Sequence, residues 1–502
     1  MKILLISKSI LILFVLINSI TVAQSTWNWV GQDNNFAISH QGVKFHNDTI
    51  NTCGLTIYYG DSIPYVTLER FKYDLNGNLL SDTRLGNMDT TYVVGNRINF
   101  MNNTFCNYGE VRYPSQPTKP YNQFAYFIDI NNNKGFKYIH PLDTPSLNLI
   151  ERAIKFDDNK YCLLFHDQPI AGTTTTISKI LFIDSLRNII QEKTFAENGY
   201  WMIPRELFKS ENYYYLLMNK QLINMINNPS DLFIYKMDTL LNLVDSFKTS
   251  SHNWYGGCTA QPLSNGDFIV AGIYSDGWQG SNVWQKKYLR KFDKYFNIIW
   301  TKYFGKRSFN TGINKLIISN DGNIVGCGID GIVTTTVNGD SIGHLTGCIF
   351  KYTLDGDSIW MRNYQALDDP LYGDENMLLD IDEMPDGGYI ASGKAMATLP
   401  TRRRGWIIRL DANGCLTTDC VSNTRELEQS TEIIAYPNPG SDLIYLSNSG
   451  LIKYYEVFKF NGDIVRQGNS FPIDMENFPN GLYFLKILTN DDKIINHKLI
   501  KQ

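Results

Sequence analysis

Short apolar stretches separated by turn residues recur along the chain at a nearly constant interval. In each copy an apolar stretch ends at a turn-favouring residue, and four positions later a second such residue precedes the next apolar stretch. Asp accepts hydrogen bonds from a turn backbone, and Asn or Gly tolerates the left-handed conformation that reverses the chain, so each pair predicts a tight hairpin. The pairs are Asp74 and Asn78, Asp129 and Asn133, Asp184 and Asn188, Asp238 and Asn242, Asp293 and Asn297, Thr353 and Asp357, and Asp411 and Cys415.

A second series of turn residues precedes the first by 24 to 31 positions: Asp48, Asn103, Asp158, Asn212, Gly266, Gly322 and Gly387. Two hairpins per repeat make four strands, and seven four-stranded units of this length match the blades of a β-propeller. The alternative is a coincidence of turn residues in an Asn-rich chain, which would not keep two series in register through seven copies. The pattern therefore predicts an all-β protein with a seven-bladed propeller of four-stranded blades over residues 24–420.

The two ends of the repeat region complement each other. After Asp411 the last repeat has no apolar fourth strand, whereas residues 26–30 form an unassigned strand that resembles the fourth strands at 298–303 and 358–362. We expect this N-terminal strand to complete the last blade and close the ring.

The first residues are typical of a secretory signal peptide. Lys2 and Lys8 flank an apolar run from Ile10 to Ile17, and the small residues Thr21 and Ala23 precede Gln24. This pattern predicts a signal peptide over residues 1–23. The alternative, a transmembrane anchor, would need about 20 apolar residues, and the run ends too early. We expect a mature protein outside the cytoplasm.

Composition narrows the function classes. The 502 residues are 43% hydrophobic and 19% charged, with 46 Lys and Arg against 50 Asp and Glu. This hydrophobic content is enough for a core, which excludes a disordered chain. Nucleic acid is not an expected partner, because phosphate binding needs a concentrated basic face.

The connections between the tight turns are long, and they carry aromatic residues. Such loops on a rigid scaffold usually hold functional residues, and aromatic faces beside polar groups suit an unknown glycan or protein ligand. The alternative for each ring is packing between blades. The candidate ligand-binding residues are Tyr108, Tyr113, Trp201, Trp254, Tyr274, Trp278 and Trp284, with Arg403 from a basic run that either meets an anionic ligand or is solvated.

Catalytic and metal signals are few. No H-E-x-x-H, G-x-S-x-G, P-loop or C-x-x-C motif is present, so the sequence indicates no catalytic residues and no resident cofactor. An acidic region between Asp368 and Asp386 offers oxygen ligands for Ca²⁺, with solvated loop carboxylates as the alternative. Cys415 and Cys420 are close enough for a disulfide in an oxidising compartment, and Cys327 and Cys348 could face each other across one hairpin.

A different pattern begins after a polar linker at 421–432. Alternating strands with Asn-Gly turns over residues 433–502 predict a small Ig-like β-sandwich. This stretch resembles the type A C-terminal sorting domain of the type IX secretion system of Bacteroidetes. The residues that carry the resemblance are Tyr436, Pro437, Asn438, Pro439, Asp442, Gly462, Asn480, Gly481, Leu482, Tyr483 and Lys498.

The resemblance implies export by the signal peptide into the periplasm, recognition by the type IX machinery and passage through the outer membrane. It also implies cleavage in the linker, followed by attachment to surface lipopolysaccharide or release. The repeats themselves are similar to propellers carried by such exported proteins, as Asp386 to Gly393 and Leu410 to Gly414 illustrate. A fold of this kind transfers no activity.

These observations favour a secreted or surface-located binding or adhesion module. A secreted carbohydrate-active or peptide-cleaving enzyme is the alternative, and it would place converging carboxylates, or a His with a partner, at the channel mouth on the long-loop side. A structural surface-layer component would instead expose apolar patches on blade edges.

Overall fold

The protein consists of β-strands throughout the part of the chain that the structure describes. This computed structural model describes residues 26–30, 36–59, 65–87, 89–94, 98–101, 103–113, 122–131, 135–140, 148–167, 175–223, 230–253, 258–279, 282–308, 310–331, 335–337, 340–342, 344–367, 374–397, 403–416, 435–436, 442–446, 452–459, 462–490 and 494–501. The chain divides into two compact units, Met1–Asn423 and Thr424–Gln502. The expected signal peptide and the whole of the expected linker lie outside the described residues.

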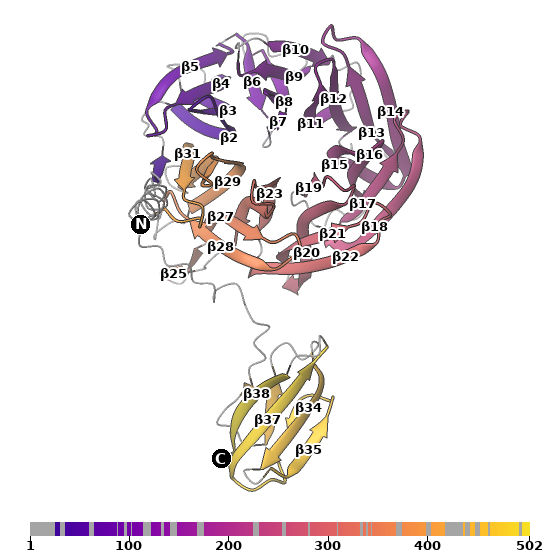
Figure 1. Ribbon diagram of the computed structural model, residues 1–502, viewed down its shortest axis with the longest axis vertical. Coiled ribbons are helices and arrows are strands. Elements are labelled where there is room, and N and C mark those ends of the chain that lie inside the picture. The colour runs from indigo at the N-terminus through magenta and orange to yellow at the C-terminus, as the bar shows by residue number, and fades with distance from the viewer. Residues whose placement is uncertain are drawn as a thin grey trace, which may run out of the picture. The chain divides into compact units, whose positions relative to one another are not determined.

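Five antiparallel sheets follow one another along the first unit (Figure 1). Four of them contain four strands in chain order, and the second contains five because its first strand is divided into β6 and β7, which both pair with β8. The strands are β2 (Phe36–His46), β3 (Thr49–Tyr58), β4 (Tyr65–Tyr73) and β5 (Leu79–Leu85); β6 (Thr91–Val94), β7 (Asn99–Met101), β8 (Thr104–Arg112), β9 (Asn122–Asp129) and β10 (Gly135–His140); β11 (Asn148–Asp157), β12 (Lys160–Asp167), β13 (Thr175–Ile183) and β14 (Ile189–Asn198); β15 (Tyr200–Ser210), β16 (Tyr213–Leu222), β17 (Ser230–Met237) and β18 (Leu243–Asn253); β19 (Thr259–Pro262), β20 (Phe268–Gln279), β21 (Asn282–Phe292) and β22 (Ile298–Ser308).

An eight-stranded sheet completes the unit and has two four-stranded halves. A parallel pairing of only two residues, His344 with Asp374 and Leu345 with Glu375, joins the halves. A separate hairpin, β25 (Thr335–Val337) with β26 (Asp340–Ile342), lies in a connection of the first half. The halves are β23 (Gly312–Ile318), β24 (Ile324–Asp330), β27 (His344–Tyr352) and β28 (Ser358–Tyr364), and β29 (Asp374–Glu383), β30 (Tyr389–Ala397), β31 (Arg403–Leu410) and β1 (Trp27–Val30).

The N-terminal strand is the outer strand of the last half-sheet, which confirms the predicted pairing. β1 runs antiparallel to β31, with Trp27 opposite Arg409 and Val30 opposite Trp406. The Trp406 indole Nε1 also donates a hydrogen bond of 2.7 Å to Asn28 Oδ1. The first and last strands of the unit are therefore neighbours.

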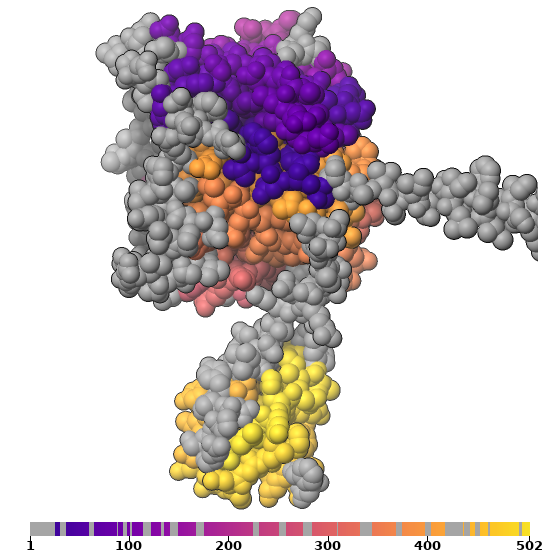
Figure 2. All heavy atoms as spheres, turned by 90° about the vertical axis from the view of Figure 1, so that its left-hand side faces the viewer, coloured from indigo at the N-terminus to yellow at the C-terminus, as the bar shows by residue number. Residues whose placement is uncertain are grey.

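The sheets surround a common centre in a propeller arrangement, and one strand of each of the five smaller sheets and of each half of the eight-stranded sheet lies nearest that centre (Figure 1). We call these strands the innermost strands: β2, β7, β11, β15, β19, β23 and β29. Figure 2 shows β2–β5, in indigo and purple, beside the orange strands of the eight-stranded sheet. The apolar core lies between neighbouring sheets. Ile154 and Phe182 of the third sheet, for example, are buried in one cluster with Leu207 and Leu216 of the fourth.

Six of the seven predicted tight turns between the third and fourth strands are present, and Asn133 of the seventh lies outside the described residues. Asp74, for example, donates its backbone N–H to the Asn78 carbonyl at 2.9 Å, and its carboxylate accepts hydrogen bonds from the Asn78 backbone and side chain, both at 2.8 Å. The expected position of the left-handed residue is wrong, however. The residue with a positive φ precedes the Asn. In three repeats this residue is Arg187, Leu241 or Phe296. In each of these three turns the Asp carboxylate accepts the backbone N–H of the Asn four residues later, which helps to hold the turn.

In six of the seven repeats, one carbonyl of this turn region joins its sheet or half-sheet to the one before it. The carbonyl group accepts a side-chain hydrogen bond from the preceding sheet, so the same contact recurs around the unit. The bonds are Arg70 to Ile130, Gln191 to Thr239, Lys236 to Lys294, Lys291 and Trp300 to Leu354, Arg362 to Asn413, and Trp27 and Arg409 to Leu75.

The C-terminal unit contains two sheets with an apolar core between them. Val457 and Leu485 from one sheet and Ile444 and Ile473 from the other are buried in that core. The first sheet has the order β35, β34, β37, β38 and the second the order β32, β33, β36. The strands are β32 (Ala435–Tyr436), β33 (Leu443–Leu446), β34 (Ile452–Lys459), β35 (Ile464–Gly468), β36 (Ile473–Asp474), β37 (Gly481–Thr489) and β38 (Ile494–Lys501).

The cysteines divide into one disulfide-bonded residue and six free thiols among the described residues. Cys415 is disulfide-bonded, and its expected partner Cys420 lies outside the described residues. The suggested facing of Cys327 and Cys348 is wrong, because both are free and the register places Cys348 opposite Gly328. A one-residue offset directs the two side chains to opposite faces of the sheet.

Candidate functional site

The expected ligand-binding residues of the second to fourth sheets are at least partly buried. Tyr108 packs in the core between the second and third sheets, and its hydroxyl accepts a hydrogen bond from Arg152 Nη1 at 3.1 Å. Tyr113 packs against the core of the first two sheets. The Trp201 ring lies 6.0 Å from that of His166. Trp254 lies outside the described residues.

The remaining candidates lie on three strands, with Tyr274 and Trp278 on β20, Trp284 on β21 and Arg403 on β31. The Tyr274 ring is 5.2 Å from that of Tyr303 on the same sheet. The Arg307 guanidinium stands 4.9 Å from the centre of the Trp284 ring. Trp278 pairs through its backbone with Val283, and Arg403 begins β31. Each long connection is described only in part, so the long-loop face remains a prediction.

Two carboxylates of the acidic region expected to suit Ca²⁺ contact the first sheet, and Asp368 and Asp369 lie outside the described residues. Asp380 accepts a hydrogen bond from the backbone N–H of Val43 at 2.8 Å. Asp382 accepts one from the N–H of Phe45 at 2.9 Å and another from Lys44 Nζ at 2.6 Å. Among the described residues no group of three or more His, Cys, Asp or Glu is placed to hold a metal ion. These carboxylates therefore join β29 to β2.

A cavity of about 630 Å³ lies among the innermost strands, and sequence reasoning missed it. Every innermost strand contributes, including Val43 of β2, Phe100 of β7, Phe156 of β11, Lys209 of β15 and Pro262 of β19. Most of these residues come from the ends of the strands that lead into the first tight turn of each repeat. The cavity thus lies toward the face that carries the tight turns, whereas the sequence predicted a binding site on the face that carries the long loops.

The cavity wall combines apolar surface with charges of both signs. Its carboxylates are Glu206, Asp380, Asp382 and Glu383, and its ammonium groups are Lys44, Lys209 and Lys315. Burial raises the pKa of Asp380 to about 6, and the nearby charge of Lys315 opposes that rise. Burial also raises the pKa of Glu383, which accepts a hydrogen bond from the Asn320 N–H at 2.6 Å. A volume of this size is typical of small-molecule sites.

The candidate sorting residues are distributed over the C-terminal unit. Tyr483 is buried, and its hydroxyl donates a hydrogen bond to the Pro479 carbonyl at 2.7 Å. Asp442 lies 3.8 Å from Lys501 Nζ, and Gly462 adopts a φ of 90° in its turn. Tyr436 pairs with Tyr445 through its backbone. Asn480 and Lys498 are exposed, and Leu482 is half-buried. Gly481 is the first residue of β37. The other candidates, Pro437, Asn438 and Pro439, lie outside the described residues.

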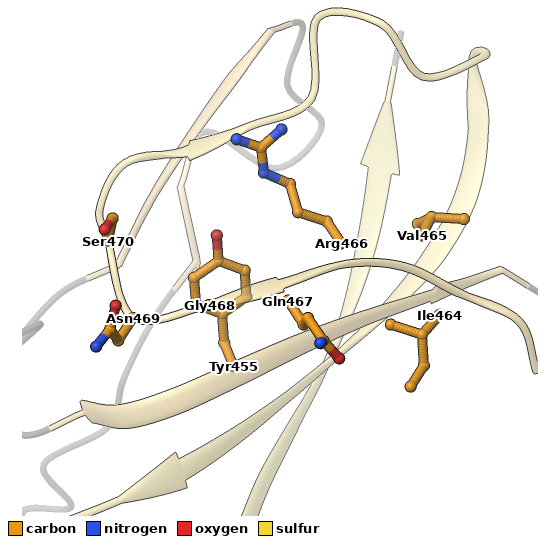
Figure 3. A pocket seen from close by; sticks show the side chains of 8 residues that line it. All are labelled: Tyr455, Ile464, Val465, Arg466, Gln467, Gly468, Asn469 and Ser470. Carbon is orange, nitrogen blue, oxygen red and sulfur yellow. The ribbon is translucent and has the colours of Figure 1, made fainter.

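The C-terminal unit also carries a shallow hollow of about 640 Å³ beside β35 (Figure 3). Its lining includes Tyr455, Ile464, Arg466 and Ser470. Arg466 Nη1 lies 3.5 Å from an Asp474 carboxylate oxygen. The hollow is polar and lies against an edge strand.

Comparison with known proteins identifies the tail. Residues 434–502 match the family model of the secretion system C-terminal sorting domain. The tail is therefore a type IX sorting domain, and the protein is exported to the cell surface or released. No curated protein matches the chain. No helix among the described residues is long and apolar enough to cross a membrane.

Solved structures match the chain at low similarity. The polysaccharide lyase Uly1 is 10% identical, with a TM-score of 0.42, and the match covers 74% of this chain and 90% of that one. The β-propeller domain of the Trilobed protease from Pyrococcus furiosus is 10% identical, with a TM-score of 0.40 and coverages of 75% and 94%. The cobalt-substituted apocarotenoid oxygenase of Synechocystis is 11% identical, with a TM-score of 0.38 and coverages of 78% and 91%. All three TM-scores lie below 0.5, and no functional inference rests on them.

Proposed function

We propose that the protein is an exported binding module, delivered by its sorting tail and binding its ligand in the cavity among the innermost strands. In this proposal residues 24–420 form a closed seven-bladed propeller, and residues 433–502 an Ig-like sandwich that the type IX machinery recognises. The signal peptide at 1–23 directs the chain to the periplasm. Cleavage in the linker at 421–432 then leaves the propeller released or attached to surface lipopolysaccharide.

The observation that carries the proposal is the cavity itself, because strands from every part of the propeller region contribute to its wall. Each carboxylate of that wall has a partner within the protein. Glu206 lies 3.8 Å from Arg152 Nε. Asp380, Asp382 and Glu383 each accept a hydrogen bond from a backbone N–H. The wall combines these anchored groups with apolar side chains, which is the composition of a small-molecule binding pocket.

Export is tested by deleting residues 434–502 and measuring the protein in the periplasm, on the surface and in the medium of a bacterium with a type IX system. The truncated chain should accumulate in the periplasm, with the protease resistance of the full-length protein as the control for folding. Normal amounts of truncated protein in the medium would contradict the role of the tail.

Binding is tested with glycan and peptide arrays and two matched variants. Ala260→Phe fills the cavity, because Ala260 lines it, whereas Ala196→Phe adds the same ring on the exposed outer strand β14. Ligands captured by the unaltered protein should be lost with Ala260→Phe and kept with Ala196→Phe. Equal capture by both variants would place the binding site elsewhere.

A further inference from the structure

The outer strands of the third, fourth and fifth sheets begin with aliphatic side chains that the fold leaves exposed. In each of these sheets an apolar pair follows the Asn of the tight turn, and in the third and fourth sheets the turn itself also exposes a leucine. We call these residues the aliphatic rim, and their exposed fractions range from 45% to 78%. The rim consists of Leu186, Ile189, Ile190, Leu240, Leu243, Val244, Ile298 and Ile299.

The aliphatic rim is continuous from one sheet to the next. Gln191 on β14 donates a hydrogen bond from Nε2 to the Thr239 carbonyl at 3.4 Å, so the turn that carries Leu240 lies against β14. Lys236 Nζ on β17 donates in the same way to the Lys294 carbonyl at 3.1 Å, in the turn that leads into β22. Figure 1 shows β14, β18 and β22 along one part of the outer edge of the ring.

The corresponding positions of the other sheets do not extend the rim. Phe136 of the second sheet packs against the core, and Ile359 on β28 is half-buried. The first sheet exposes Leu79 and Leu80, at 55% and 54%, but the second sheet separates this pair from the rim (Figure 1). The aliphatic rim is therefore confined to one sector of the unit.

The area of the rim is large enough for a stable interface. Eight side chains, each about half exposed, present on the order of 800 Å² of apolar surface, which is what one partner contributes to an ordinary protein–protein interface. A monomeric protein usually leaves only a few hundred Å² exposed in one apolar patch. Covering the rim would remove this surface from water, which favours association.

The charges beside the rim suit a second copy of the same surface. Glu192 and Lys193 are neighbours on β14, and Asp245 and Lys248 both lie on β18. Interspersed charges of both signs can oppose unlike charges when the surface meets its own copy, whereas an anionic membrane attracts clustered basic residues. Within the described residues, β14, β18 and β22 each pair with a single strand, so each has an open edge along the rim.

We propose that the aliphatic rim is the interface of a symmetric homodimer. The rims of two copies pack against each other about a twofold axis, so that each aliphatic side chain is covered by the partner. Because the rim occupies one sector only, this pairing closes with two copies and does not continue into a filament or a layer. The inference goes beyond the proposed ligand binding, since the rim lies on the outside of the ring and the cavity lies among the innermost strands.

The test is sedimentation analysis of the mature full-length protein from about 0.01 to 100 µM, because interfaces of this area span micromolar and tighter affinities. The unaltered protein should be dimeric at the upper end of this range. Leu243→Lys places an unpaired charge in the interface once from each copy, and it should raise the dimer dissociation constant at least about tenfold. The matched control is Leu79→Lys, which should leave that constant unchanged. It alters the same position of the first repeat, at 55% exposure against 52%.

Several results would overturn the dimer. These are a monomer up to about 100 µM, a folded Leu243→Lys variant that dimerises like the unaltered protein, or an equal effect of Leu79→Lys. Leu240→Lys, at a turn residue that is 73% exposed, replaces Leu243→Lys if circular dichroism shows that the latter does not fold.

Two further measurements distinguish other occupants of the rim. Dimerisation that appears only after deletion of residues 434–502 would show that the sorting tail covers the rim, and it would refute the proposal. Flotation of the protein with vesicles of phosphatidylcholine and phosphatidylglycerol, if lost with Leu243→Lys, would assign the rim to a lipid surface and would also refute it. A dimer that is unchanged by the deletion and does not float would support the proposal.

Discussion

The indole Nε1 of Trp27 donates a hydrogen bond of 2.8 Å to the backbone carbonyl of Leu75. Arg409 Nη1 donates to the same carbonyl oxygen at 2.8 Å. Trp27 belongs to the N-terminal strand β1 and Arg409 to its partner β31, whereas Leu75 lies in a turn of the first sheet. Two side-chain hydrogen bonds to one carbonyl oxygen thus join the last half-sheet to the first sheet.

Trp27→Ala should destabilise the first unit. The variant loses this hydrogen bond and the packing of a half-buried ring, for which we expect a cost of about 2 kcal/mol. Urea unfolding followed by fluorescence measures the loss. Tyr295→Ala, at a residue that is 70% exposed, is the control and should change stability by less than about 0.5 kcal/mol. Equal effects of the two variants would contradict the closing role of Trp27.

A buried ion pair links the fifth sheet to the eight-stranded sheet. Lys287 Nζ lies 2.6 Å from Asp330 Oδ1, and the two side chains are 0% and 2% exposed. Asp330→Ala leaves the lysine charge buried without its carboxylate, so we expect a loss of about 3–5 kcal/mol in the free energy of unfolding. The double variant with Lys287→Met should recover much of that loss in denaturant unfolding. A double variant as unstable as Asp330→Ala alone would show that the pair matters mainly for packing.

The carboxyl group of Asp380 makes stability fall as pH rises. Burial raises its folded-state pKa from 3.8 to about 6, so between these values the folded protein holds a proton that the unfolded chain has lost. The stability that this proton gives is fully present below pH 4 and is lost as pH passes 6.

Asp380→Asn keeps an oxygen for the Val43 N–H and cannot ionise. Relative to the unaltered protein, the variant should therefore gain up to about 3 kcal/mol of stability as pH rises from 4 to 7. Denaturant unfolding at a series of pH values measures the difference. A constant difference across that range would contradict the buried titration.

His40 has the opposite effect, because burial lowers its pKa from 6.5 to about 3. Its ring contacts the Thr52 hydroxyl at 3.0 Å. The unfolded chain binds a proton below pH 6.5 that the folded protein does not, so stability present above that pH is lost as pH falls. In NMR titrations the His40 ring signals should not shift between pH 8 and 5, while denatured protein titrates near 6.5. A His40 midpoint near 6 would contradict this assignment.

Thiol counting tests the disulfide. The six described cysteines with free thiols are buried, and Cys415 is disulfide-bonded. Alkylation of denatured protein should label six thiols without reductant and all eight after reduction, with the reduced protein as the control. Peptide mapping should place Cys415 and Cys420 in the bridged fragment. Eight labelled thiols before reduction would exclude the bridge.

Local patterns predicted most of the strand arrangement. The pairs Asp74 with Asn78 and Asp293 with Asn297 form the expected turns, because their hydrogen bonds join residues only four positions apart. The division of the first strand of the second sheet into β6 and β7 was not predicted, since no local pattern marks it. Tyr108 illustrates a different limit. Its apolar and polar neighbours in sequence do not reveal that Arg152 lies against its hydroxyl.

The repeating hairpins, the partner of the N-terminal strand and the sorting tail could be predicted from the amino-acid pattern, because each depends on residues that are close in the chain or on a recurring motif. Which charged side chains find partners could not be predicted in this way. Asp380 and Val43 are far apart in the chain, yet they meet where the last half-sheet contacts the first sheet. The charge of Lys315 on β23 acts on Asp380 of β29 for the same reason. Burial and ion pairing depend on contacts between sheets, and the sequence of one repeat does not show which residues of other repeats lie next to it.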